Sequence, residues 1–164
     1  MDWIRQLGRY IVVMLLQVLL FNQLQLFGVC HPYVYVMCLL MMPLTLSQNA
    51  DMIIGAAVGL VMDMFCNSLG VHTAACILLM FIRPYLVGVL VNDKDRLNEQ
   101  LTSRTLGIEA MIKYVVIMVL IHHFMVFMLA AWSWTHFWFV LAETAVSSLL
   151  TIAIILGYSI LNDK

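Results

Sequence analysis

Charged side chains stand at three positions inside otherwise apolar stretches of this chain: Asp63, Arg83 and Glu143. His122 and His123 lie in another apolar stretch and can be neutral. An ionisable group inside a bilayer is costly unless it is paired or solvated, so these positions are the first candidates for a functional site. The chemistry open to them is the binding of a ligand, an ion or another helix.

Asp63 shares one helix face with Gly55 and Gly59, because the three residues recur every four positions. The two glycines let a neighbouring backbone approach closely. The carboxylate then has two interpretations. It binds a partner or ligand, or it accepts N–H bonds from the 67–71 turn or the next helix. Two further packing or partner-binding candidates follow it, Gly70 and His72.

Arg83 is expected to extend toward the cytoplasmic side rather than to pair with Asp63. In an antiparallel hairpin that turns near residue 68, Asp63 is level with about residue 74, and Arg83 lies ~13 Å deeper along the helix. Pro84 lacks the N–H that would bond to residue 80, so a kink is expected there. Arg83 and Pro84 are therefore structural or partner-binding candidates.

Glu143, Ser147 and Thr151 form a second stripe of four-residue spacing, a polar seam. Such a seam is expected to hold helices together, with ion transfer as the alternative. Across a turn near residue 134, Glu143 is ~4.5 Å along the axis from His122, which predicts a Glu143–His122 hydrogen bond. Adjacent histidines face different ways on a helix, so no metal site is predicted at His122 and His123.

The composition is that of an integral membrane protein. Of the 164 residues, 64% are hydrophobic and 10% are charged, and the mean hydropathy is +1.00. A soluble domain is ~45–50% apolar and ~25% charged, so a water-soluble enzyme is excluded. The net charge of −1 offers no basic surface for nucleic acid. The four cysteines form no C-x-x-C pair and are expected to be buried thiols, and no cofactor motif is present.

Long runs without Asp, Glu, Lys or Arg cover residues 10–50, 114–142 and 144–162. A membrane-spanning helix needs ~20 apolar residues. With the Gly, Pro and polar turns between apolar stretches, these runs predict one all-α domain over 1–164 with six transmembrane helices. The helices are expected at about 7–26, 33–46, 52–66, 71–91, 108–131 and 137–161, with a cytoplasmic loop at 92–107. Because the second and third are short, the alternative is four crossings with 33–66 as a re-entrant hairpin.

The basic residues fall on one side of this expected bundle. The side of the N-terminus holds all of the 8 Lys and Arg residues except Arg83: Arg5, Arg9, Lys94, Arg96, Arg104, Lys113 and Lys164. The positive-inside rule then places both termini in the cytoplasm. Three tryptophans are expected at the opposite interface, Trp132, Trp134 and Trp138.

One stretch resembles the signature of the rod shape-determining protein MreD family, Gly55-Ala-Ala-Val-Gly59-Leu-Val-Met-Asp63-Met-Phe-Cys-Asn-Ser-Leu-Gly70-Val-His72-Thr-Ala. The family pattern is roughly G-x-x-x-G-L-x-x-D-L, a short turn and L-G-x-x-A, on the third and fourth helices. The chain matches it at Gly55, Gly59, Leu60, Asp63, Leu69, Gly70 and Ala74 and departs from it at Met64 and Arg83-Pro84. Sequence matching is confined to about residues 52–91, and the layout of six crossings resembles the family over the whole chain.

The resemblance implies a non-enzymatic component of the bacterial elongation machinery in the cytoplasmic (inner) membrane. The family works with MreC, which has one membrane helix and a periplasmic domain. It also works with the MreB filament, the polymerase RodA and its penicillin-binding transpeptidase, and together they direct lateral peptidoglycan synthesis and set rod shape. The family's fold is similar to the substrate-capture subunits of energy-coupling-factor transporters.

Two functions follow as hypotheses. A scaffold would bind other membrane helices through its small-residue faces and outer helix ends, and Gly59→Leu is expected to abolish partner recovery without preventing insertion. A substrate-capture or small-solute transport subunit would have a pocket that opens outside near Asp63, His72 and Glu143. A transporter pocket needs several convergent polar groups, and the sequence predicts few, which favours the scaffold.

Overall fold

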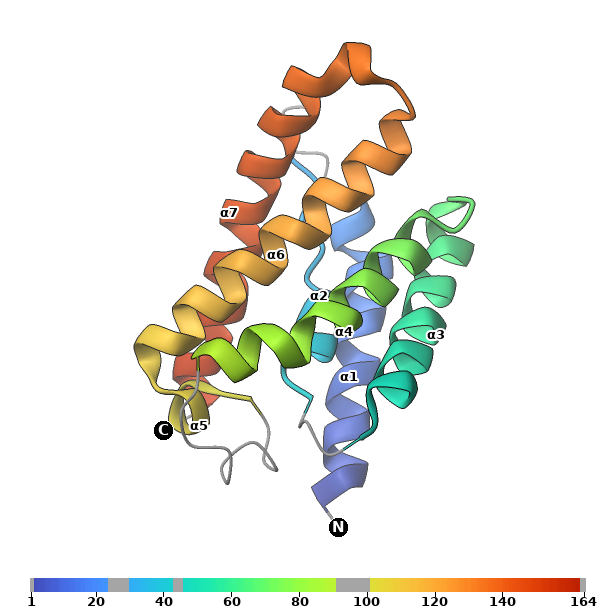
Figure 1. Ribbon diagram of the computed structural model, residues 1–164. Helices are drawn as coiled ribbons and strands as arrows, with labels where there is room; N and C mark the ends of the chain where they lie inside the picture. The colour runs from blue at the N-terminus through green and yellow to red at the C-terminus, as the bar shows by residue number, and fades with distance from the viewer. Residues whose placement is uncertain (1, 24–29, 43–45, 91–100, 163–164) are drawn as a thin grey trace.

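Helices make up all the regular structure in the described part of the chain (Figure 1). The computed structural model describes residues 2–23, 30–42, 46–90 and 101–162. In chain order the elements are α1 (Asp2–Leu19), the 3₁₀ turn η1 (Phe21–Gln23), α2 (Val36–Leu40), α3 (Gln48–Cys66), α4 (Val71–Leu90), α5 (Ser103–Leu106), α6 (Ile108–Ala131), the 3₁₀ turn η3 (Trp134–His136) and α7 (Phe137–Asn162). The predicted all-α class is confirmed for these residues.

Within the described residues, four helices are long and apolar enough to cross a membrane: α3, α4, α6 and α7 with the turn before it. The apolar helical stretch Leu7–Gln23 is shorter. The chain is therefore a multi-pass membrane protein, while the number of six crossings stays a prediction. The 19 residues of α3 extend over about 28 Å, close to the ~30 Å of the hydrocarbon layer. A re-entrant arrangement of 33–66 is not needed to accommodate α3.

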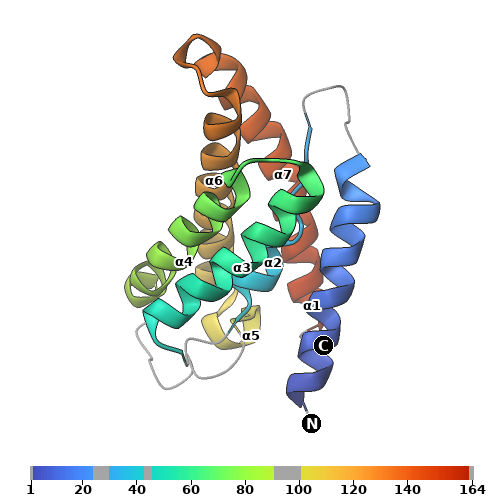
Figure 2. The same ribbon diagram turned by 90° about the vertical axis from the view of Figure 1, so that its right-hand side faces the viewer.

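The helices form one bundle in which α3 packs along α4, and α6 packs along both α4 and α7. Figures 1 and 2 show that α1 begins and α7 ends at the same end of this bundle. We call it the termini end. The opposite end, called the turn end, carries the α3–α4 and α6–α7 turns (Figure 1).

The helix boundaries agree best with prediction in the second half of the chain. α6 occupies the predicted 108–131, and α7 and α4 begin at the predicted residues 137 and 71. The predicted last residue of α4 and most of the predicted loop 92–107 lie outside the described residues, and the described part of that loop contains α5. α3 begins at Gln48 rather than 52, because the Ser47 side chain caps it by accepting the Ala50 N–H at 3.4 Å.

The predicted helix at 33–46 is wrong over most of its described length, because only Val36–Leu40 is α-helical. Residues 30–35 before it form a non-helical segment, which we call the irregular segment. Pro32 disfavours a helix here, since it lacks an N–H and restricts the residue before it. The predicted first helix, 7–26, also ends early, at Leu19, and residues 24–26 and 43–45 are outside the described part.

The core surrounds the irregular segment and α2. Its fully buried apolar side chains include Tyr35, Leu39, Leu40, Met62, Leu79, Met80, Leu101, Tyr114, Met118 and Ile155. Non-helical backbone at membrane depth is tolerated where protein encloses it. The polar groups of the irregular segment must therefore be satisfied by side chains from the surrounding helices.

Candidate functional site

Asp63 joins the end of α3 to the start of α4 through four hydrogen bonds, which we call the Asp63 clamp. Its Oδ1 accepts the Ser68 hydroxyl at 2.6 Å and the His72 N–H at 2.9 Å. Its Oδ2 accepts the Thr73 N–H at 2.9 Å and the Thr73 hydroxyl at 2.6 Å. Two backbone donors that a helix N-terminus leaves unpaired are thereby satisfied. Capping of the next helix was one of two roles that the sequence predicted for Asp63, and these bonds have that role. They occupy both carboxylate oxygens of Asp63, which is 5% exposed.

The glycine face of α3 lies against α4. A Cβ on Gly59 would stand 2.5 Å from the Thr73 Cα, and one on Gly55 would stand 3.0 Å from the Cys76 carbonyl oxygen. The close approach that the two glycines permit is thus made within this chain. Gly70 is different, because nothing lies within 4 Å of its Cβ position and its φ is +80°. It serves the backbone conformation of the turn.

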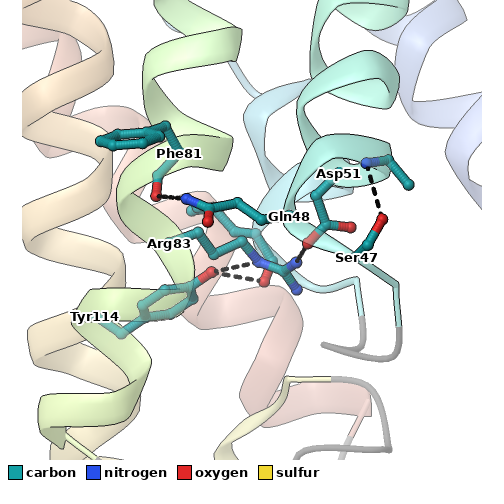
Figure 3. A network of polar contacts seen from close by, with 8 residues as sticks. Ser47, Gln48, Asp51, Phe81, Arg83 and Tyr114 are labelled. Atoms are coloured by element: carbon teal, nitrogen blue, oxygen red, sulfur yellow. Dashed lines mark hydrogen bonds and ion pairs between the residues drawn. The ribbon is translucent and has the colours of Figure 1, made fainter.

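Arg83 is fully buried near the termini end and lies in a polar network with Asp51 (Figure 3). Its Nη1 is 3.4 Å from the Asp51 Oδ2. Its Nε donates to the Tyr114 hydroxyl at 3.2 Å, and that hydroxyl donates to the Leu40 carbonyl at 2.9 Å. As expected, Arg83 does not pair with Asp63, but it is fully buried and paired within the bundle instead of extending into water. A buried carboxylate and a phenol take the place of water around the guanidinium.

Asp51 is the partner that sequence reasoning missed, because it lies between the predicted helices at 33–46 and 52–66. The antiparallel register that excludes an Asp63–Arg83 pair sets Arg83 level with about residue 53. Asp51 is close to that level once α3 begins at Gln48. The residue spacing therefore pointed to Asp51 as the partner of Arg83, provided that the start of α3 was placed correctly.

The network around Arg83 is only partly satisfied. Arg83 Nη2 and Asp51 Oδ1 are both buried and have no hydrogen-bond partner. Gln48 stands beside the network and donates from its Nε2 to the Phe81 carbonyl at 3.3 Å (Figure 3). Pro84 follows Arg83 without ending α4, which continues to Leu90.

Ser147 and Thr151 of the polar seam bind the irregular segment. The Ser147 Oγ accepts the His31 N–H at 2.9 Å, and the Thr151 Oγ1 accepts the Tyr33 N–H at 3.2 Å. The Thr151 hydroxyl is also 3.2 Å from the His123 Nε2. The seam was expected to hold helices together, and it does so in part through non-helical backbone. It supplies partners that a helical ladder would otherwise provide.

Gln17 of α1 completes the support of the irregular segment, and sequence reasoning missed it. Its Nε2 donates to the Pro32 carbonyl at 3.1 Å, and its Oε1 accepts the Tyr35 N–H at 3.2 Å. Gln17 is 0% exposed. A single amide in an apolar run, followed downstream by a proline, was the available signal.

The predicted Glu143–His122 hydrogen bond is wrong. The His122 Nε2 is 2.8 Å from the Tyr35 hydroxyl, and its Nδ1 has no hydrogen-bond partner. The same hydroxyl is 3.1 Å from the His72 Nδ1. Counting residues from the α6–α7 turn gave the level of each side chain but not the rotation of its helix. His122 faces the core, whereas Glu143 lines a cavity.

Tyr33 and Tyr35 gather three histidines of two helices into a buried His–Tyr cluster: Tyr33, Tyr35, His72, His122 and His123. The Tyr33 ring centroid is 5.0 Å from that of His72 and 5.2 Å from that of His123. In the described ranges, no three His, Cys, Asp or Glu side chains are placed to hold a metal ion. The rings of the cluster meet mostly edge to face, and the Tyr35 hydroxyl is hydrogen-bonded to His72 and His122.

Two cavities share His31 and Tyr33. The His72 cavity has a volume of about 370 Å³, and Asn22, Cys66 and Ser68 contribute to its wall. The Glu143 cavity has a volume of about 450 Å³ and is lined mainly by rings and small residues: Phe127, Ala130, Ala131, His136, Phe139 and Val140. His72 and Glu143 thus line neighbouring cavities, whereas Asp63 lines neither. More polar groups converge here than the sequence predicted.

No family model, curated protein or solved structure matches this chain. The chemistry of the site therefore follows from its own residues. The Asp63 clamp and the Arg83 network join elements of the bundle and have their main partners inside it. Glu143 differs from both, because it makes no hydrogen bond or ion pair with another described residue and lines an open cavity.

Proposed function

We propose that this protein is a non-enzymatic membrane scaffold of the bacterial elongation machinery, similar to the MreD family. In this role it binds an MreC-like single-pass membrane protein and helps to organise lateral peptidoglycan synthesis and rod shape. A RodA-like polymerase, a penicillin-binding transpeptidase and the MreB filament are further partners of the proposal. The resemblance of residues 52–91 to the family pattern supports it.

The observation that carries the proposal is the way in which the motif residues act together. Gly55, Gly59 and Asp63 lock α3 to α4, and Gly70 shapes the turn between them. A turn held in this way presents a fixed surface, so a partner that binds it loses little conformational entropy. This rigidity is what a scaffold requires of its recognition surface.

An apolar groove lies beside this turn, between α4 and the end of α6, with a volume of about 670 Å³. Leu69 and Trp132 line it and are 103% and 85% exposed. Its other lining residues are Asn67, Ser68, Gly70, Val71, Ala74, Leu129 and Ala130. Small residues in the wall allow close approach of another helix. We propose this groove as the site of the partner's membrane helix.

The proposed orientation places both termini in the cytoplasm of a bacterial cell. Arg9, Arg104 and Lys113 belong to elements that start or lie at the termini end (Figure 1). The tryptophans at 132, 134 and 138 are 78–85% exposed and belong to the turn end. Basic residues on the cytoplasmic side and tryptophans at an interface are the expected distribution for this orientation.

The test is photo-cross-linking in native membranes followed by copurification. A photoreactive residue at Leu69 is expected to capture a stoichiometric single-pass membrane protein with a periplasmic domain. The matched control is Val89, which is 80% exposed near the other end of α4. Equal capture from both positions, or no such partner from Leu69, would contradict the proposal.

Gly59→Leu is not a suitable variant for testing partner recovery. Because Gly59 faces the α4 backbone, a leucine there is expected to disrupt the hairpin itself. Lost recovery would then report on folding. Leu69 and Trp132 avoid this difficulty, because their side chains are exposed.

A substrate-capture subunit is the second candidate, and the two cavities at His31 and Tyr33 favour it. Their polar wall combines side chains from several parts of the bundle, as a small-molecule site requires. The same purification separates the candidates. A bound small molecule together with an ATPase partner would support capture, and a single-pass periplasmic partner would support the scaffold.

A further inference from the structure

The Glu143 cavity combines one carboxylate with a wall rich in rings: Tyr33, Phe127, Phe139, His31 and His136. Among the described residues of this wall, Glu143 is the only acidic side chain, and neither Lys nor Arg is present. Its carboxylate makes no hydrogen bond or ion pair with another described residue. A partly buried carboxylate that has no hydrogen bond or ion pair with a described residue favours the arrival of a cation.

We propose that the Glu143 cavity binds an ammonium group, carried by a small free amine or by a lipid headgroup. Aromatic faces attract cations. The carboxylate adds the opposite charge and accepts the N–H donors of a primary ammonium. The volume of about 450 Å³ lies within the ~300–1,000 Å³ of small-ligand sites.

The wall of this cavity is held in place before any ligand arrives. Ser147 and Thr151 lie on α7 in the same stripe as Glu143, and they bind the His31 and Tyr33 N–H groups. One helix therefore positions both the carboxylate and the segment that carries two of the rings. Such preorganisation lowers the entropic cost of binding.

The position of the cavity in the bundle admits both sources of the ammonium group. It lies toward the turn end, where Trp138 is 80% exposed on the first turns of α7. Tryptophans of this kind mark the membrane–water interface, the level at which lipid headgroups and dissolved amines are both available. The inference goes beyond the scaffold role and does not depend on it.

The experiment has two arms and uses the full chain, purified in detergent. In the first arm, choline chloride or ethanolamine is added against sodium chloride at equal ionic strength, and the thermal unfolding midpoint is recorded. A ligand that binds the folded state raises that midpoint. In the second arm, the protein is reconstituted with equal amounts of phosphatidylethanolamine and phosphatidylglycerol, and native mass spectrometry identifies the lipid that it retains.

Glu143→Gln keeps the shape of the side chain and removes its charge, and Glu109→Gln is the control, since Glu109 is exposed at the opposite end of α6. The wild type and Glu109→Gln are expected to bind ammonium, with roughly tenfold weaker binding by Glu143→Gln. Phe139→Leu, which removes one ring, is expected to bind with intermediate affinity and provides the test if Glu143→Gln fails to fold.

A response in the first arm alone assigns the site to a free amine, and preferential retention of phosphatidylethanolamine assigns it to a lipid headgroup. No response of the wild type in either arm would overturn the inference. So would an equal response of the wild type, Glu143→Gln and Phe139→Leu. Because the purified protein contains no partner, this result is separate from the cross-linking test of the scaffold.

Discussion

Asp51 and Asp63 are two buried carboxylates on the same helix, 2% and 5% exposed, and their surroundings differ sharply. Asp63 accepts four hydrogen bonds from neutral donors that lie at most 10 residues away in sequence. Asp51 has one ion pair, to an arginine 32 residues away, and its second oxygen has no partner. The first is a local cap, whereas the second is a tertiary contact.

The difference teaches how a carboxylate can be kept inside a membrane helix pair. A cap uses backbone N–H donors that would otherwise be unpaired, so the carboxylate and the N–H groups both gain hydrogen-bond partners. A buried ion pair must instead offset the desolvation of two charges. Loss of one partner destabilises the fold, because the other charge stays buried without a counter-ion. Asp51 and Arg83 are therefore expected to depend on each other more strongly than Asp63 depends on any single donor.

Removal of the arginine is expected to have the largest effect. Arg83→Met leaves the Asp51 charge buried without a counter-ion, and the free energy of unfolding is expected to fall by about 3–5 kcal/mol. Denaturant titration of the purified protein in detergent measures the loss. The double variant with Asp51→Asn is expected to regain most of it. A wild-type midpoint for Arg83→Met alone would show that the pair contributes nothing.

The close approach beneath the Asp63 clamp is tested by a single methyl group. Gly59→Ala places a Cβ 2.5 Å from the Thr73 Cα, and a loss of about 2–3 kcal/mol in the free energy of unfolding is expected. Gly88→Ala is the matched control, because nothing lies within 4 Å of its Cβ position. That control is expected to leave stability equal or slightly higher, since alanine favours helix. Equal midpoints for both variants would argue against the close contact.

The clamp itself is expected to give a smaller loss than either change. Asp63→Ala leaves the His72 and Thr73 N–H groups without their acceptor, for a loss of about 1–2 kcal/mol. Asp63→Asn keeps one acceptor oxygen and is expected to lose less. Hydrogen exchange at the two amides provides the site-specific measurement. Slow exchange of both amides in Asp63→Ala would show that another group caps α4.

An exposed ion pair completes the series and is expected to have the smallest effect. Lys113 and Glu109 are 2.6 Å apart, with side chains 55% and 84% exposed. Because water and salt screen such pairs, Lys113→Met is expected to leave the unfolding midpoint unchanged within error. A loss comparable to that of Arg83→Met would remove the distinction between buried and exposed pairs in this protein.

Helix positions were predictable where turn residues mark the ends of the helices. α6 coincides with the predicted 108–131, and α4 and α7 begin where predicted, because turn residues separate long apolar runs. The capping of α4 by Asp63 was also predictable, since cap and donors are close in sequence. The second predicted helix failed because its apolar composition fits a helix as well as a buried irregular segment.

For the polar side chains too, some properties were predictable from the sequence and others were not. Spacing alone placed Ser147 and Thr151 on one face of a helix, but it could not show that this face meets the His31 and Tyr33 backbone. Likewise, residue spacing placed Glu143 and His122 at similar levels along their helices. It could not show that the rotation of the two helices points these side chains in different directions.

By itself the sequence determined that the chain is an all-α membrane protein, where α4, α6 and α7 begin, and that Gly55, Gly59 and Asp63 share one face of a helix. These properties depend on composition and on residues a few positions apart. The tertiary structure decided that Arg83 pairs with Asp51, that α7 and Gln17 support a non-helical segment, and that Glu143 faces a ring-lined cavity. Such contacts depend on the rotation and tilt of helices far apart in sequence, which side-chain packing sets and residue spacing does not encode.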